Sequence, residues 1–374
     1  MNRLLLAMLL LAVAHLHASA QHLRARTNEQ QQISISTFAP ATTAAQPRSG
    51  EDGYEQLPGF PMAFVASKAN KNFRNVTLAD LDDDGAEEII VAIANNLYLI
   101  DETGVVWKKG VAGIGIYPPS IADIDQDGSL DIIQVTGGIQ QVGGIYIVDK
   151  DGNDLPGWPI SINDNWILNS PAIADVDDDG SLEIIVNELS NPRGKVHLLK
   201  SDGSSYSDNW PALLDNTSAV TPSVGDVDND GQKEIVFCST RSIYVMELDG
   251  LPATGWPVQN PNTKFSFQSP VLVDFEDDGF MEIIGTAHGD LPEYYVFNHD
   301  GSYRNGWPVV IPDTSWSFSP PALYRDGSEN FIFTSRPIFL PQDTMVTDDM
   351  FYAFDSTGQL QPGFPIQQQD GCEG

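Results

Sequence analysis

Basic residues are scarce in this chain of 374 residues. Only 19 Lys and Arg accompany 52 Asp and Glu, so the net charge at pH 7 is −33. Binding to nucleic-acid phosphates requires a basic face. The composition therefore argues against a nucleic-acid partner.

Cysteine is scarcer still. The two cysteines, Cys238 and Cys372, are too few for a disulfide scaffold. Cys238 follows an apolar run at 235–237, so we expect it to be a small buried residue. A disulfide between the two stays open, because an oxidising compartment would permit it.

Long apolar runs are confined to the N-terminus. Residues 1–20 combine a basic Arg3, an apolar stretch and a small-residue ending, which is typical of a signal peptide cleaved before Gln21. His15 and His17 make the apolar stretch too short to span a bilayer. We therefore expect a secreted, extracellular or cell-surface protein with no transmembrane segment.

Catalytic motifs are also missing. The sequence contains no H-E-x-x-H, no G-x-S-x-G and no P-loop. His197 is expected in a strand, His299 in a turn and His288 in a loop that could face a ligand. We name no catalytic and no cofactor-binding residue, and the question of enzymatic activity stays open.

One acidic loop, by contrast, occurs five times. Each copy has acidic side chains at positions 1, 3, 5 and 9 and Gly at position 6: DLDDDGAEE (80–88), DIDQDGSLD (123–131), DVDDDGSLE (175–183), DVDNDGQKE (226–234) and DFEDDGFME (274–282). Alternate carboxylates in a tight turn supply the hard oxygen ligands that Ca²⁺ prefers, and glycine permits the bend at positive φ. A catalytic carboxylate pair would occur once rather than five times.

We predict about five structural Ca²⁺ ions, each bound by the side chains at positions 1, 3, 5 and 9 and by the main-chain carbonyl at position 7. Glu276 replaces Asp at position 3 of the fifth loop, and its extra methylene should loosen that site. The predicted ligands are Asp80, Asp82, Asp84, Ala86 and Glu88; Asp123, Asp125, Asp127, Ser129 and Asp131; Asp175, Asp177, Asp179, Ser181 and Glu183; Asp226, Asp228, Asp230, Gln232 and Glu234; and Asp274, Glu276, Asp278, Phe280 and Glu282.

Strand patterns flank every loop. Position 12 lacks the Glu that closes an EF-hand, and β-branched runs such as 184–186 follow position 9 instead. A short strand precedes the loop, while a third strand, a turn and an aromatic–Pro step such as 157–159 follow. Four short strands in about 50 residues are typical of a propeller blade. We predict an all-β fold, a β-propeller of four-stranded blades with the calcium loops between first and second strands, and with the aromatic of each step packed between blades.

Six repeats are recognisable, and the sixth has lost the loop. Tyr324 stands where Asp274 stands in the fifth repeat, so we expect no calcium there. Segment 57–61 matches the outer strand of a blade and is expected to complete the last one, but 361–365 is a second copy. Six blades or a partial seventh both stay open. The predicted organisation is a signal peptide at 1–20, a flexible leader at 21–52 and one propeller at 53–374.

The loop D-x-D-x-D-G-x-x-[DE]-I-[IV] between two strands resembles the FG-GAP/VCBS repeats of integrin α-chain propellers and of many secreted bacterial proteins. The resemblance covers residues 54–366. It implies an integrin-like, calcium-binding propeller, but fold alone does not fix function. One function is a non-enzymatic cell-adhesion or ligand-binding module for an extracellular glycan or protein. The other is the scaffold of a secreted polysaccharide-degrading lyase or hydrolase.

The resemblance also implies that the connection before each first strand lies on the face away from calcium. Trp166 and Trp316 stand there among polar residues, and we predict that they bind ligand. The alternative is that the aromatics of this connection fill the rim between blades. The full set is Phe73, Tyr117, Trp166, Phe265, Phe267, Trp316 and Phe318.

Overall fold

The computed structural model describes two strands near the N-terminus and residues 76–138, 142–163, 165–189, 193–260, 263–265, 268–289, 292–311, 320–327, 329–338 and 348–368. The chain divides into two compact units, Met1–Phe60 and Pro61–Gly374. In the first unit, β1 (His22–Thr27) pairs with β2 (Ile33–Phe38) in antiparallel fashion. Both strands lie inside the segment 21–52, and its assignment as a leader stays a prediction, as does the signal peptide.

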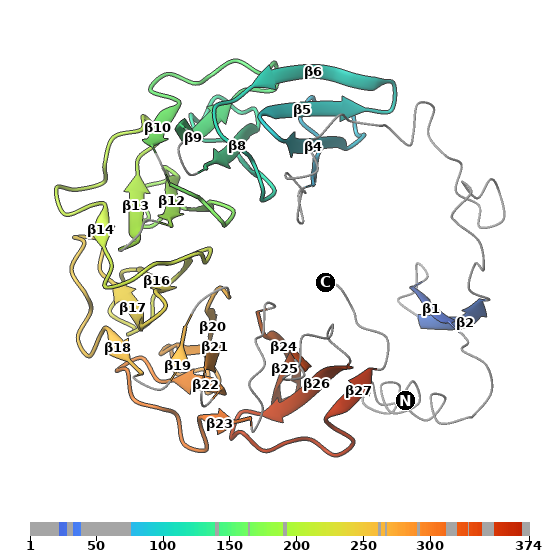
Figure 1. Ribbon diagram of the computed structural model, residues 1–374, viewed down its shortest axis with the longest axis vertical. Helices are drawn as coiled ribbons and strands as arrows, with labels where there is room; N and C mark the ends of the chain where they lie inside the picture. Colours follow the sequence, from blue (N-terminus) through green and yellow to red (C-terminus); the bar gives the residue numbers. More distant parts are fainter. Residues whose placement is uncertain are drawn as a thin grey trace. The chain divides into compact units, whose positions relative to one another are not determined.

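The described part of the second unit consists of six antiparallel sheets that follow one another in chain order (Figure 1). It contains no helix. The sheets are β3 (Thr77–Ala79), β4 (Glu88–Ile93), β5 (Asn96–Asp101) and β6 (Gly104–Gly110); β7 (Ser120–Ala122), β8 (Asp131–Thr136), β9 (Val142–Val148) and β10 (Ile160–Asn163); β11 (Ala172–Ala174), β12 (Glu183–Glu188), β13 (Lys195–Leu199) and β14 (Ala212–Leu213); β15 (Ser223–Gly225), β16 (Glu234–Cys238), β17 (Ser242–Met246) and β18 (Val258–Gln259); β20 (Val271–Val273), β21 (Glu282–Gly289), β22 (Glu293–Phe297) and β23 (Val309–Val310); and β24 (Ala322–Asp326), β25 (Glu329–Ile338), β26 (Asp348–Asp355) and β27 (Ile366–Gln368). This confirms the predicted all-β propeller of four-stranded blades.

The second strand of a blade is buried on both faces. Every residue of β8, β12 and β16 is buried. This explains why these segments read as continuous apolar runs rather than as the alternation of a strand with one wet face. The first strands have three residues in five of the six sheets, and the predicted loops begin directly after them.

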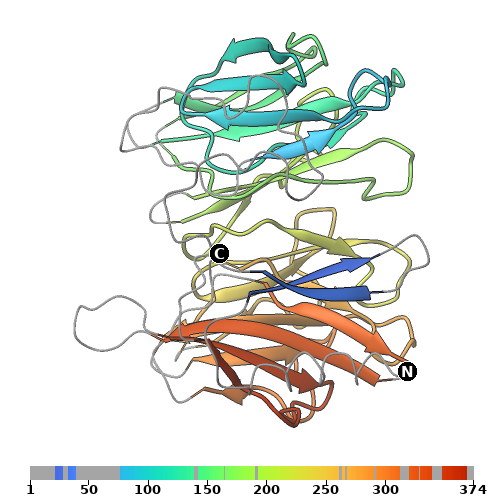
Figure 2. The same ribbon diagram turned by 90° about the vertical axis from the view of Figure 1, so that its right-hand side faces the viewer.

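The core lies between consecutive sheets. One cluster joins Ile133, Val135 and Ile147 of the second sheet to Ile184 and Val186 of the third. A larger cluster runs through the third, fourth and fifth sheets in the same way. Figure 2 shows the same sheets from the side. Because each blade buries its faces against its neighbours, no blade is a complete folding unit alone.

Four of the five aromatic–Pro steps carry a tryptophan, and each of these tryptophans joins its blade to the next. Trp158 is only 6% exposed, and its indole N–H donates to the carbonyl of Ser201 in the third blade at 2.9 Å. The same bond recurs from Trp210 to the carbonyl of Leu248, from Trp256 to that of His299 and from Trp307 to that of Ser356. The prediction that these aromatics pack between blades is therefore confirmed.

The sixth blade replaces the acidic loop by a tight hairpin. Strand β24 has five residues, and its ladder with β25 runs to the pair Asp326 and Glu329. Gly327 turns the chain at φ 64°. Segment 57–61 lies outside the described residues, so the closing strand and the choice between six and seven blades stay predictions. The fifth sheet carries one extra short strand, β19 (Thr263–Lys264), which also pairs with β21.

Three histidines and one cysteine can be checked against expectation. His197 lies in β13 and His299 in a turn, as expected. His288 does not lie in a loop that faces a ligand: it lies in β21 and is 4% exposed, because β21 extends through that segment, so this prediction was wrong. Cys238 is a buried free thiol whose pKa is raised to about 12 by burial, as expected of a small core residue. Cys372 lies outside the described residues.

In the described part of the chain, no helix has the length and apolar character needed to cross a membrane.

Candidate metal centres

All five loops adopt the same backbone turn. Glycine at position 6 has φ between 88° and 91°, which confirms the predicted bend. The residue at position 4 also lies in the left-handed region, at φ between 57° and 61°. Sequence reasoning missed this second bend. Its signal was present, since four of the five residues there are Asp or Asn, which tolerate this conformation better than most: Asp83, Gln126, Asp178, Asn229 and Asp277.

The loop carboxylates hold this backbone from inside. In the third loop, Asp175 Oδ1 accepts the N–H of Asp179 at 3.1 Å, and Asp175 Oδ2 accepts that of Gly180 at 2.9 Å. Asp179 Oδ1 accepts the N–H of Ser181 at 2.7 Å. The fourth and fifth loops repeat all three bonds. The carboxylates thus lie close together because each accepts main-chain N–H groups of the same turn. Their negative charges are therefore concentrated in one place.

The acidic residue at position 9 sits at the start of the second strand and is buried. One of its oxygens accepts the N–H of position 2 in every loop, for example from Val227 to Glu234 at 2.7 Å and from Ile124 to Asp131 at 2.9 Å. Burial, assisted by repulsion from the nearby Asp side chains, raises the pKa of Glu234 to about 7 and that of Asp131 to about 6. The main-chain N–H stabilises the charged form of this buried carboxylate in part, and a nearby positive charge would stabilise it further.

Four loops bring three acidic side chains to one point. Within each group, one oxygen per side chain lies within 4.8 Å of the others. The groups are Asp80, Asp82 and Glu88; Asp123, Asp125 and Asp127; Asp175, Asp177 and Glu183; and Asp226, Asp228 and Asp230. The predicted ligands Asp84, Asp131, Asp179 and Glu234 belong to the same loops but not to these groups. The carbonyls of Ala86, Ser129, Ser181, Gln232 and Phe280 stay predicted ligands.

Unsatisfied oxygens show that these residues fit a cation. Asp123 Oδ1, Asp228 Oδ1 and Glu234 Oε1 are buried and have no hydrogen-bond partner among the described residues. A buried acceptor without a partner is unfavourable by about 1–3 kcal/mol, and more for a charged group. The donor set consists of carboxylate oxygens, which suits a hard cation such as Ca²⁺.

The fifth loop differs, because a side chain enters it. Arg304 lies in the turn between β22 and β23, and its Nη1 bonds Glu276 Oε2 and Glu282 Oε1, both at 2.9 Å. Its Nη2 bonds the other oxygen of Glu276. Glu276 and Glu282 are the predicted ligands at positions 3 and 9. Among the described residues, the fifth loop does not form a cluster like those of the other four.

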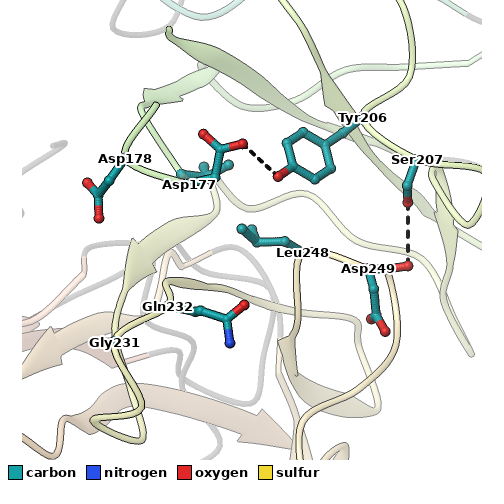
Figure 3. A pocket seen from close by; sticks show the side chains of 9 residues that line it. Asp177, Asp178, Tyr206, Ser207, Gly231, Gln232, Leu248 and Asp249 are labelled. Carbon is teal, nitrogen blue, oxygen red and sulfur yellow. Dashed lines mark hydrogen bonds between the residues drawn. The ribbon is translucent and has the colours of Figure 1, made fainter. Parts of the chain in front are cut away.

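The equivalent residue of the third blade is Tyr206. Both residues donate their main-chain N–H to the third strand at 2.9 Å, Tyr206 to Leu198 and Arg304 to Val296. The hydroxyl of Tyr206 donates to Asp177 Oδ2 at 2.8 Å, at the edge of a hollow of about 400 Å³ (Figure 3). The hollow lies between the third and fourth blades and is also lined by Gln232, Leu248 and Asp249.

In the second to fifth loops, the position 4 side chain connects the loop to the next blade. Gln126 Nε2 donates to the carbonyl of Gly180 at 2.6 Å. Asp178 pairs with Lys233 of the fourth loop, and Asp277 pairs with Arg325 of the sixth blade at 2.6 Å. The left-handed bend at position 4 explains this, since it turns the side chain away from the carboxylates and toward the neighbour.

The predicted ligand aromatics have mixed outcomes. Trp166 is half-buried, and its carbonyl accepts the N–H of Leu189 at 2.8 Å, at the end of β12 that lies away from the acidic loop. Trp316 lies outside the described residues. Both stay predictions. Phe265 does not belong to an exposed set: it is fully buried with its ring edge-on to Tyr295 at 5.4 Å, so at this position the rim-filling alternative holds.

Comparison with known proteins adds little to this geometry. No family model matches the chain, and no curated protein does. Solved structures that resemble it include the V. cholerae biofilm matrix protein Bap1 (19% identity, TM-score 0.45, 65% of this chain), BBS1N in complex with ARL6DN (13%, 0.42, 82% of this chain and 96% of that chain) and quinohemoprotein alcohol dehydrogenase from Comamonas testosteroni (10%, 0.46, 80% and 61%). This chain spans only 40% of the length of Bap1. At such low similarity the fold assignment depends on the sheet topology itself.

Proposed function

We propose that this protein is a secreted, calcium-stabilised β-propeller of the FG-GAP/VCBS kind that acts as a non-enzymatic binding module for an extracellular glycan or protein. The observation that carries the calcium part is the convergence of three acidic side chains in each of four loops. In two of these loops, buried oxygens have no hydrogen-bond partner among the residues that the structure describes. A bound Ca²⁺ would supply the positive charge that these carboxylates lack.

The role of the metal is structural rather than catalytic in this proposal. Each acidic loop joins the first and second strands of a blade, and every residue of the second strand is buried in the second, third and fourth blades. Neutralising the loop therefore stabilises the strand that both neighbouring blades pack against, so ion binding contributes directly to folding. At extracellular calcium concentrations, dissociation constants of about 10⁻⁴–10⁻³ M would suffice.

Metal analysis tests the calcium part. The intact chain, equilibrated with Ca²⁺ and desalted, is expected to retain several ions per molecule, and Mg²⁺ is not expected to replace them. A chain that retains no ion, with a melting temperature unaffected by chelator, would refute this part.

The binding part is supported by polar side chains beside Trp166. Asn165 donates to Glu188 Oε1, and Glu188 Oε2 lies 2.8 Å from His197 Nε2. Lys195 pairs with the same carboxylate. The buried Glu188 carboxylate holds these groups in place. A half-exposed indole next to an amide, an ammonium and an imidazole held in this way can stack on a sugar ring and bond its hydroxyls.

A glycan array tests the binding part. Trp166→Ala is expected to abolish binding while the calcium-dependent melting stays unchanged. A reducing-sugar release assay on plant and algal polysaccharides separates this function from the polysaccharide-degrading alternative. Release of sugar by the wild-type chain would favour the enzyme.

A further inference from the structure

The fifth loop has the fold of the other loops but a different charge balance. Asp274 Oδ1 accepts the N–H of Asp278 at 3.1 Å, Asp274 Oδ2 that of Gly279 at 2.8 Å, and Glu282 Oε2 that of Phe275 at 3.1 Å. The turn is therefore intact. The difference concerns the carboxylate oxygens that do not accept a main-chain N–H, because in the fifth loop they have another partner.

A direct comparison with the fourth loop shows the change atom by atom. At position 9 of both loops, one carboxylate oxygen accepts the N–H of position 2. The other oxygen, Glu234 Oε1, is buried in the fourth loop and has no hydrogen-bond partner in the part of the chain that the structure describes. The same oxygen of Glu282 accepts a hydrogen bond from Arg304 Nη1 at 2.9 Å.

The side chain at position 3 of the fifth loop also bonds Arg304. The fifth loop is the one with Glu instead of Asp at this position, and both oxygens of Glu276 bond the guanidinium of Arg304. The longer side chain suits a fork-to-fork pair with arginine, which is stronger and more directional than a single contact. The pairing holds the pKa of Glu276 below its usual value.

Arg304 is fixed from its other sides as well. Its Nε donates to the carbonyl of Ser356 in the sixth blade at 3.0 Å, and its Cζ lies 4.9 Å from the ring centre of Phe275. Its side chain is 16% exposed. Arg325 is a useful contrast: it pairs with the same loop at Asp277, a position outside the predicted ligands, and is 43% exposed.

We infer that the guanidinium of Arg304 takes the place of Ca²⁺ in the fifth loop, so that the chain binds one ion fewer than it has acidic loops. This inference rests on the proposed calcium function of the other four. The sixth blade has a short hairpin in place of an acidic loop. If Arg304 replaces the ion in the fifth blade, neither of the last two blades depends on metal.

Ion counting on Arg304→Ala tests it, with Arg325→Ala as the matched control. Both variants remove an arginine paired with the fifth loop, but only Arg304 bonds predicted ligand residues. The expected result is one more Ca²⁺ per chain in Arg304→Ala than in wild type, and no gain in Arg325→Ala. No gain in Arg304→Ala, or five ions in the wild type, would overturn the inference and leave the calcium function standing. No ions in the wild type would overturn the calcium function, and the inference with it.

Glu276→Gln provides a second test that does not require loss of the arginine. If Arg304 holds the fifth loop, this variant should lower the melting temperature by the same few degrees with calcium and with chelator. Asp177→Asn in the third loop should lower it only with calcium. A loss in Glu276→Gln that disappears under chelator would contradict the inference.

Discussion

The third and fifth loops share one backbone turn but differ at position 3, Asp177 against Glu276, and in the side chain that reaches that position. Tyr206 reaches the third loop and Arg304 the fifth, from the same place after the third strand of each blade. The tyrosine hydroxyl is neutral, so it orients Asp177 without cancelling charge. The guanidinium cancels charge and bonds two carboxylates. A residue 22 positions beyond the end of the acidic motif therefore decides whether the carboxylates at positions 3 and 9 have a positive partner within the protein itself.

The sixth blade shows a third solution to the same connection. It joins its first two strands by a short hairpin, and its ladder extends over five residue pairs where the third blade has three. The main-chain ladder between β24 and β25 holds this connection. Acidic loop, arginine-filled loop and plain hairpin thus occupy equivalent places in one fold.

The largest expected effect is that of removing metal. EDTA should lower the melting temperature by more than about 10 °C, because four carboxylate clusters lose their counter-charge together. Mg²⁺ should not restore it, since Mg²⁺ demands a tighter octahedral site. Hydrogen exchange in EDTA below the transition should show lost protection in β4, β8, β12 and β16 and retained protection in β21 and β25. Equal loss of protection in all six blades would contradict the distinction between the four metal-dependent loops and the last two blades.

A smaller effect is expected at the contacts between blades, which do not depend on metal. Trp210→Ala should destabilise the protein by about 3–5 kcal/mol, because it removes a large buried ring. Trp210→Phe keeps most of the ring but loses the N–H bond to Leu248, and about 1 kcal/mol of its cost should come from that bond. Urea unfolding with and without calcium measures both. A cost that appears only with calcium would mean that the ring acts through the loops.

The smallest effect separates ligand from non-ligand positions in one loop. With calcium, Asp177→Ala should cost about 1.5–3 kcal/mol, as expected for loss of a bond to a charged group. Asp178→Ala should cost at most about 1 kcal/mol, because its exposed pairing with Lys233 contributes little. Thermal melts with and without chelator provide the measurement. Equal costs for the two variants would count against the assignment of position 3 as a ligand.

Local regularity made much of this protein predictable. Strand–loop–strand repeats follow from β-branched runs on either side of an acidic turn, and Gly at position 6 fixed the bend because few other residues adopt positive φ there. The tryptophans of the aromatic–Pro steps were correctly placed between blades, because a side chain that recurs at one position of every repeat has the same neighbour each time.

Prediction was less successful where the chain departs from its own repeat. His288 was expected in a loop that could face a ligand, yet β21 extends through that segment. For Phe265 two interpretations stayed open, and its burial in the core supports the rim-filling one. Glu276 stays a predicted calcium ligand, but nothing in the nine-residue motif reveals its pairing with Arg304. These outcomes depend on the packing of one particular blade, and the pattern that the repeats share carries no information about that packing.

The sequence by itself determined the repeat, the strand order within a blade, the turn of each acidic loop and the gathering of its carboxylates, since all of these depend on residues close together in the chain. Only the tertiary structure decided which partner each carboxylate meets. Arg304 reaches Glu276 across 28 residues, and Lys233 reaches Asp178 across 55. The physical reason is that a carboxylate is stabilised by whichever positive charge the fold brings within a few ångströms, and distance along the sequence does not limit that choice.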